Sequence, residues 1–292
     1  MIAFPPLLKP LKGLRILSFA LNLPGPAALI RLRAMGARCT QVLPPAGDPM
    51  AHYSPQAHGD LSSGIRQVTL DLKAPNGQQQ LARRLAQADV LLTSFRPSAL
   101  RKLGLDARQL RHTFPQLNTV AIVGAPGERA EEPGHDLTYQ AEVGLVQGLQ
   151  LPPSLLADMA GALAASEAVL QVVLQQQRTG KAAHGEVALS EAARWLAWPW
   201  TWGLTGPGDL LGGAHAGYRV YVCKNGRVAL AALEPHFAAA LGRVVGLSPL
   251  TPQDCLLPAT HEVVAAFVAR KTRAQLDRLA IQHDLPLLTL PP

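Results

Sequence analysis

Charged, aromatic and cysteine residues are all scarce in this sequence. Only 16% of the 292 residues are charged, against roughly 25% in an average domain, and 5% are aromatic. The three cysteines, Cys39, Cys223 and Cys255, form no C-x-x-C pair and have no histidine at metal-ligand spacing. Neither a disulfide framework nor a zinc site is therefore indicated, and we expect no bound metal and a reducing, cytoplasmic setting.

Basic residues are in excess but are not clustered. The formal net charge is +7, yet no stretch gathers a run of Lys or Arg with interleaved aromatic residues. A groove for nucleic acid needs such a cluster. We therefore expect no nucleic-acid partner and interpret the positive charge as attraction for a smaller anionic ligand.

A secretion signal and a membrane-spanning segment are not indicated either. Three prolines interrupt residues 1–13, and no small-residue cleavage site follows an apolar run there. The longest apolar helical stretch, 154–173, contains Asp158 and Glu167. Each would cost about 2.5–3.5 kcal/mol at the centre of a bilayer. We expect a soluble protein without a membrane partner.

Short apolar runs alternate with amphipathic segments in the first 125 residues, and one more apolar run follows at 185–190. The predicted strands are 15–21, 39–43, 67–72, 90–95, 118–123 and 185–190. Segments with helical periodicity, such as 26–36 and 76–88, separate them. Continuous apolar strands separated by helices are typical of a parallel sheet covered on both faces. The fold class predicted is α/β, with a Rossmann-like, doubly wound domain.

Two helical stretches, 136–149 and 154–178, precede the last of these strands, and a different pattern follows it. Gly and Pro accumulate around 201–217, which indicates a linker. Beyond it, a predicted hairpin turns at Asn225-Gly226, and helical periodicity follows over 234–247 and 261–280. The predicted organisation is a large domain over 1–200, a linker over 201–217 and a small α+β domain over 218–292.

Two polar residues in apolar or loop surroundings are candidates for chemistry. Asp158 is flanked by Leu, Ala and Met, where an unpaired carboxylate costs several kcal/mol or takes up a proton. It is either a functional carboxylate or the N-cap of a helix. His135, in the sequence PGHD, is either functional or a surface histidine followed by Asp136 as the N-cap of a helix that begins at Leu137.

The order and spacing of several segments resemble the family III CoA-transferases, which include formyl-CoA transferase and the α-methylacyl-CoA racemases. The resemblance covers most of the chain. It rests on LKGLRIL (11–17), PGPAALIRLRAMGARCTQV (24–42), PPAGDPM (44–50), LDLK (70–73), SFRPSALRKLGLD (94–106), PGHDLTYQAEVGL (133–145), LLADMAGALAASEAVL (155–170), RTGKAAHGEVALSEA (178–192) and LEPHF (233–237).

The resemblance implies roles for five residues. Asp158 matches the catalytic Asp, which is a nucleophile in the transferases and an acid/base in the racemases. His135 matches a racemase His in a GHD motif, where transferases usually carry an aromatic residue. Glu234 matches a Glu that hydrogen-bonds the catalytic His, and Arg96 and Lys73 match positions at the CoA cleft.

The resemblance also implies a homodimer of interlocked chains, in which Glu234 serves the site of the partner. It implies an acyl-CoA substrate and no cofactor beyond the coenzyme A that this substrate carries. The chain departs from the family at Gln41, Leu43 and Ile65, where CoA contacts are usual, and a C-terminal segment that returns to the large domain is not present after 284–292.

Three hypotheses remain at this point, in this order. The first is an isomerase that racemises an α-branched (2-methyl) acyl-CoA by moving a proton between two bases, His135 and Asp158. The second is a CoA-transferase in which Asp158 takes the acyl group and then CoA. The third is a degenerate, non-catalytic paralogue that binds acyl-CoA.

Overall fold

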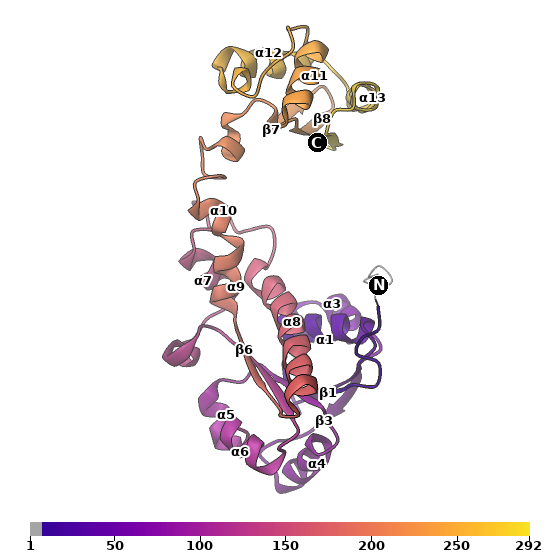
Figure 1. The fold of residues 1–292 in the computed structure, drawn as a ribbon, viewed down its shortest axis with the longest axis vertical. Helices are drawn as coiled ribbons and strands as arrows, with labels where there is room; N and C mark the ends of the chain where they lie inside the picture. Colours follow the sequence, from indigo (N-terminus) through magenta and orange to yellow (C-terminus); the bar gives the residue numbers. More distant parts are fainter. Residues whose placement is uncertain (1–7) are drawn as a thin grey trace. The chain divides into compact units, whose positions relative to one another are not determined.

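The computed structural model describes residues 8–292. Residues 1–7, which include much of the stretch considered as a secretion signal, lie outside the described residues. The chain divides into two compact units, Met1–Ala197 and Trp198–Pro292. Each unit is described by itself, and Figure 1 labels its elements along the chain.

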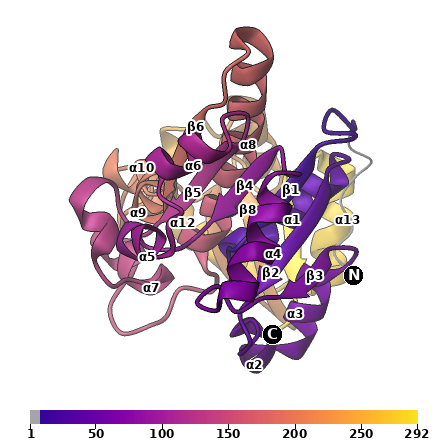
Figure 2. The same ribbon diagram turned by 90° about the horizontal axis from the view of Figure 1, so that it is seen from below.

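The first unit is built on a six-stranded sheet in which every pair of neighbours is parallel. The strand order is β3-β2-β1-β4-β5-β6, and Figure 2 shows the strands side by side. This confirms the predicted doubly wound α/β fold. The strands are β1 (Arg15–Ser18), β2 (Arg38–Leu43), β3 (Arg66–Thr69), β4 (Val90–Thr93), β5 (Asn118–Val123) and β6 (His184–Ala188).

Helices cover both faces of this sheet because neighbouring strand residues point to opposite sides. Ile16 and Leu92 pack into a core with the first and longest helices of the unit, whereas Leu17 and Leu91 pack into a second core with three helices on the other face. The helices of this unit are α1 (Pro24–Ala34), α2 (Met50–Tyr53), α3 (Pro55–Ser62), α4 (Pro75–Leu85), α5 (Pro97–Leu103), α6 (Ala107–Thr113), η1 (Gly127–Glu131), α7 (Asp136–Glu142), α8 (Leu156–Thr179) and α9 (Leu189–Leu196).

The helix α8 is long and apolar enough to cross a membrane by length and composition. In this unit, however, it is a core helix. Half of its most apolar window is buried, and Ala162, Ala165 and Val169 pack into the core beside α1 and β5. Its last residue, Thr179, is followed by Gly180, which has a φ of 71° and is a typical left-handed helix terminus.

The preceding helix is shorter than predicted. A helix was expected over 136–149, but α7 ends at Glu142. Gly144 follows with a φ of 78°, and Gly148 with a φ of 58°. Both conformations belong to the left-handed region, which suits Gly and ends a right-handed helix. The segment from 143 to 155 therefore runs as loop and turn up to the start of α8.

The second unit is a three-stranded antiparallel sheet with helices, as the α+β pattern predicts. Its strands are β7 (Tyr218–Cys223), β8 (Gly226–Ala231) and β9 (Leu287–Leu290). Its helices are α10 (Trp198–Thr201), η2 (Leu210–Ala214), α11 (Pro235–Val245), η3 (Asp254–Leu256), α12 (Pro258–Ala269) and α13 (Arg273–His283). The short helix α10 ends where the Gly/Pro-rich segment 201–217 begins, and η2 lies within that segment.

Three details of this unit differ from the prediction. Cys223 pairs with Gly226, so the two loop residues of the hairpin are Lys224 and Asn225 rather than Asn225 and Gly226. The helical pattern over 261–280 is two helices, because Thr272 caps α13 with its hydroxyl and breaks the run. The strand β9, which pairs with β8, was not predicted.

Candidate functional site

A cavity of about 190 Å³ opens at the carboxyl ends of β1, β4 and β5. In a sheet of this order the succession of the strands reverses between β1 and β4, and ligands of open α/β sheets bind outside the carboxyl ends at that point. The lining comes from segments far apart in the sequence. Its polar side chains are Asn22, Ser94, Arg96, Glu132, His135, Tyr139 and Asp158.

Asp158 lies in the first turn of α8 and is half-buried. The alternative that it is an N-cap is wrong, since α8 begins at Leu156 and its N-cap is Leu155. Burial, together with the negative charge of Asp136, raises the pKa of Asp158 to about 6 from an ordinary 3.8. Asp158 is therefore a carboxyl group that exchanges its proton near neutral pH, as general acid/base chemistry requires.

Asp136 holds the start of α8 in place. It was expected to cap the helix after it, but His135 is the N-cap of α7 and Asp136 is its first helical residue. Its buried carboxylate instead accepts the backbone N–H of Asp158 at 2.9 Å and the side-chain amide of Gln140. The backbone N–H of Asp158 is thus already occupied by the Asp136 carboxylate.

His135 is exposed and lines the same cavity as Asp158. Its backbone is fixed by Thr138. The N–H of His135 donates to Thr138 Oγ1 at 3.1 Å, and the Thr138 hydroxyl donates to the carbonyl of His135 at 2.7 Å. The structure therefore brings together two of the predicted site residues that are 23 positions apart in the chain.

Tyr139 is a cavity residue that the sequence interpretation missed. It is buried, and the pKa of its phenol is raised by burial and by the charge of Asp158. An added Cβ on Gly124 would lie 2.3 Å from the Tyr139 hydroxyl, and one on Gly134 would lie 2.5 Å from it. Both glycines therefore make room for the phenol. The readable signal is that Tyr139 follows His135 by four positions, which is one helical turn.

Asn22 is a second missed residue, at the turn between β1 and α1. Its φ of 63° lies in the left-handed region, where Asn is one of the tolerated residues. Its N–H donates to the buried Asp48 carboxylate at 3.0 Å. Its side-chain Oδ1, which belongs to a residue of the cavity lining, is buried and has no hydrogen-bond partner among residues 8–292. Asn22 thus offers an unused acceptor to a ligand.

The other three predicted site residues lie in different places. Arg96 is exposed, precedes α5 and lines the cavity. Lys73 is exposed in the loop after β3, at the carboxyl edge of the sheet, but does not line this cavity. Glu234 belongs to the second unit, where it is the N-cap residue of α11 and makes no side-chain cap bond.

The three positions that depart from the family pattern have buried side chains. Gln41, Leu43 and Ile65 are each no more than 9% exposed. The Gln41 amide donates to the carbonyl of Ala20 at 3.2 Å and to the Asp48 carboxylate at 3.3 Å. Gln41 therefore supports the turn that holds Asn22 and faces inward.

Possible metal ligands do not gather in the part of the chain that the structure describes. Between residues 8 and 292 there is no group of three or more His, Cys, Asp or Glu able to hold a metal ion. The cysteines Cys39, Cys223 and Cys255 are free and buried.

The raised pKa of Asp158 has a consequence for stability. A carboxyl whose folded-state pKa is raised favours folding when protonated, so this contribution is lost as the pH rises from about 4 through about 6. We expect Asp158→Asn to raise the free energy of unfolding above pH 6 by an amount on the order of 2 kcal/mol, and to change little at pH 4. Urea titrations at both pH values measure it. The control is Glu167→Gln, at an exposed carboxylate of the same helix, and an equal gain there would contradict the assignment.

Comparison with known proteins decides the family. The sequence model described as CoA-transferase family III matches residues 11–290. The chain belongs to the CoA-transferase family III. This confirms the resemblance drawn from the motifs.

The family relatives include both racemases and transferases. A probable fatty acyl-CoA transferase of Mycobacterium tuberculosis, Rv3272, is 32% identical over 203 residues, which are 63% of this chain and 52% of that protein. The human alpha-methylacyl-CoA racemase is 28% identical over 287 residues, 91% of this chain and 73% of the racemase. A cinnamoyl-CoA:phenyllactate CoA-transferase of Clostridium sporogenes is 32% identical over 47% of this chain and 36% of its own length. The chain thus spans about half of the first of these proteins.

Solved structures agree on the fold. The crystal structure of Rv3272 in an orthorhombic form has a TM-score of 0.80 at 25% identity, covering 97% of this chain and 83% of that one. A CAIB/BAIF family protein from Brucella suis has a TM-score of 0.80 at 22% identity, covering 98% of this chain and 84% of that one. The fold of the family III CoA-transferases therefore extends over nearly the whole chain.

Proposed function

We propose that this protein acts on acyl-CoA thioesters and racemises an α-branched, 2-methyl acyl-CoA by two-base proton transfer. The observation that carries the proposal is that His135 and Asp158 line one cavity, at the edge of the sheet where such folds bind ligands. The similarity to an alpha-methylacyl-CoA racemase over 91% of the chain supports it.

The proposed reaction needs one base on each face of the α-carbon. One base removes the α-proton, and the C–H electron pair passes into an enolate of the thioester. The other base, which is protonated, then returns a proton to the opposite face. Asp158, with a pKa of about 6, can act as acid or base near neutral pH, and the imidazole of His135 is the second group that can carry the proton.

Charged residues of the family pattern complete the proposal. Arg96 is exposed in the cavity lining and supplies a forked donor for a phosphate of CoA. Lys73 supplies a second charge at the same edge of the sheet. Glu234 of a partner chain hydrogen-bonds His135 in an interlocked homodimer, and no cofactor is needed beyond the CoA of the substrate. Light scattering tests the dimer, and a monomer would contradict it.

Proton exchange tests the reaction without knowledge of the natural acyl chain. The experiment is proton NMR of (R)- and (S)-2-methylacyl-CoA with the protein in D₂O. The α-proton signal of both enantiomers is expected to disappear, with formation of the other enantiomer. Binding of the thioester without any loss of that signal would contradict racemisation.

A CoA-transferase is the second candidate, favoured by the transferases among the relatives. In that reaction the Asp158 carboxylate attacks the thioester carbonyl, and CoA leaves as the thiolate. The CoA thiolate then attacks the Asp158 carbonyl of this anhydride, which releases the donor acid and leaves an Asp158–CoA thioester. The acceptor carboxylate displaces CoA from that thioester to give a second anhydride, and the CoA thiolate attacks the acceptor carbonyl, which releases the new acyl-CoA and free Asp158. Hydroxylamine would trap the acyl-enzyme at Asp158, and His135→Ala would leave turnover nearly unchanged. A protein that binds acyl-CoA but gives neither exchange nor an adduct is the non-catalytic third case.

A further inference from the structure

Five arginines converge on a second cavity, at the opposite edge of the same sheet. The cavity has a volume of about 440 Å³ and lies at the amino ends of the first three strands. Arg15, Arg38 and Arg66 are the first residues of β1, β2 and β3, and Arg33 and Arg84 come from the last turns of α1 and α4. Among the described residues 8–292, no Asp or Glu lines this cavity.

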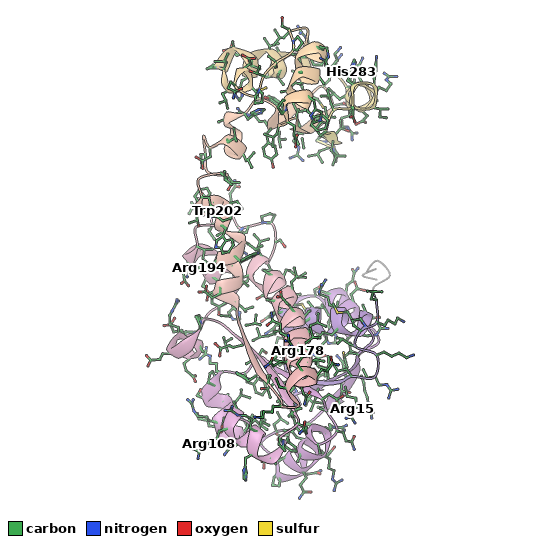
Figure 3. All side chains as sticks on the ribbon, in the orientation of Figure 1. Arg15, Arg108, Arg178, Arg194, Trp202 and His283 are labelled. Carbon is green, nitrogen blue, oxygen red and sulfur yellow. The ribbon has the colours of Figure 1, made fainter. Side chains whose placement is uncertain are left out.

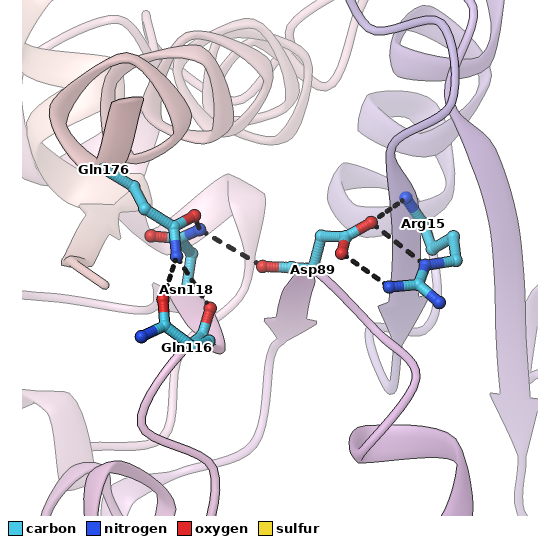
Figure 4. Close-up of polar contacts among 5 residues, drawn as sticks. All are labelled: Arg15, Asp89, Gln116, Asn118 and Gln176. Atoms are coloured by element: carbon cyan, nitrogen blue, oxygen red, sulfur yellow. Dashed lines mark hydrogen bonds and ion pairs between the residues drawn. The ribbon is translucent and has the colours of Figure 1, made fainter. Parts of the chain in front are cut away.

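The carboxylate of Asp89 is engaged by one of these arginines, Arg15. Asp89 accepts the Arg15 backbone N–H at 2.7 Å, Nε at 3.1 Å and Nη2 at 2.8 Å, as Figure 4 shows. On its other side the backbone carbonyl of Asp89 accepts the amide of Asn118 at 3.2 Å, so neutral amides continue this edge of the sheet. Asp89 therefore leaves the other four guanidinium groups uncompensated.

The other four guanidinium groups form no ion pair within residues 8–292. These groups belong to Arg33, Arg38, Arg66 and Arg84. The Arg84 Nε is buried and donates to no acceptor in the part of the chain that the structure describes. The positions of Arg33 and Arg84 in the last turns of helices are favourable in themselves. A position at a helix end does not explain why the Arg84 Nε is buried without an acceptor among the described residues. It also does not explain why five positively charged side chains line one cavity.

The position of Arg33 also depends on a glycine. A Cβ added to Gly64 would lie 2.3 Å from Nη2 and 2.4 Å from Cζ of Arg33, so the guanidinium rests on the bare backbone of this residue. Gly64 has a φ of 68° and forms part of the cavity lining. The guanidinium is therefore held at the cavity by the shape of the backbone.

We propose that this cavity binds a diphosphate group, separately from the site at the carboxyl edge. Guanidinium forks bind phosphate oxygens in pairs, and an anion of single charge would leave three of the four arginines uncompensated. The volume suits a small phosphorylated ligand such as a nucleoside diphosphate. Two kinds of ligand carry a diphosphate group. One is free diphosphate or a nucleoside diphosphate, and the other is CoA, whose own diphosphate has the same chemistry.

The test is calorimetric titration of the whole chain with inorganic diphosphate, ADP and CoA at low salt. Arg66→Gln is expected to weaken diphosphate binding roughly tenfold, and Arg33→Gln with Arg66→Gln roughly a hundredfold. The control Arg108→Gln removes an exposed charge on α6, apart from Arg15 (Figure 3), and is expected to change affinity less than about twofold. No binding of diphosphate, or equal losses in the control, would overturn the proposal.

Two Gly→Ala variants distinguish a cavity with a defined shape from a positively charged surface that attracts any anion. Gly64→Ala keeps every charge but forces Arg33 away, so diphosphate affinity is expected to fall several-fold. Gly47→Ala changes a residue of similar φ, 78°, whose added Cβ meets nothing within 4 Å. Equal affinity of the two alanine variants would contradict a built site. Thermal melts of both identify any loss due to unfolding alone.

The same variants distinguish the two sources of diphosphate and keep this proposal independent of the proposed function. If the cavity is a separate site, Arg66→Gln weakens diphosphate and ADP binding and leaves the KM for acyl-CoA unchanged. A KM that rises by the same factor would place the CoA of the substrate here and overturn the separate site. Diphosphate binding can be measured even if the chain has no racemase activity.

Discussion

Removing either proposed base is expected to stop racemisation while leaving proton exchange of one enantiomer. His135→Ala and Asp158→Asn should each lower the rate of racemisation roughly 10³-fold or more, because the proton can no longer be returned to the opposite face. The remaining base still faces one side of the α-carbon. Each variant should therefore exchange the α-proton of one enantiomer with D₂O, and the two variants should exchange opposite enantiomers.

Chiral chromatography of the thioester product and NMR of its α-proton measure both effects in the same samples. His112→Ala, an exposed histidine on α6, is the matched control and should behave as the unaltered protein. Exchange of the same enantiomer by both variants would place the two groups on one face and contradict the two-base assignment. An unchanged rate of racemisation in His135→Ala would show that the second base is a residue other than His135.

The large-scale fold could be predicted because its strands are buried on both sides. The six predicted strands of the first unit all occur, since a parallel sheet covered by helices leaves continuous apolar runs in the sequence. Helix ends were less readable. The end of α7 at Glu142 depends on Gly144 adopting a positive φ, which composition does not dictate. The break before α13 was readable, since Thr272 and Gln275 form a capping box.

The properties of the site could be predicted from the sequence only where they depend on one residue and its neighbours in the chain. The apolar neighbours of Asp158 indicated a perturbed carboxyl group, and its pKa is raised to about 6. The partner that contributes to this shift was misread, because an Asp beside a helix start can bond its own helix or another one. Asp136 bonds the start of α8, 22 residues further along the chain. Such a choice is made by tertiary packing, as is the convergence of the arginines at the amino edge.

Asp136 is therefore expected to set both the acidity of Asp158 and the stability of the α7–α8 junction, and two substitutions separate these roles. Asp136→Asn keeps a carbonyl oxygen for the Asp158 N–H but removes the negative charge. The pKa of Asp158 should then fall from about 6 toward, but not to, 3.8, because burial is the larger cause of its rise. Since Asp158 must be ionised to act as a base, the acidic limb of the pH–rate profile should move to lower pH by roughly half a unit to one unit.

Asp136→Leu removes the acceptor as well. It leaves the backbone N–H of Asp158 and the amide of Gln140, both in the buried junction, without this partner. The expected loss of stability is on the order of 3 kcal/mol, or a fall in Tm of roughly 6–12 °C for a unit of this size. Asp136→Asn should melt within a few degrees of the unaltered protein. If the acidic limb of the pH–rate profile shifts in Asp136→Asn while the Tm stays unchanged, Asp136 has an electrostatic role that a purely structural residue would not have. If the acidic limb does not move, the charge of Asp136 does not act on Asp158.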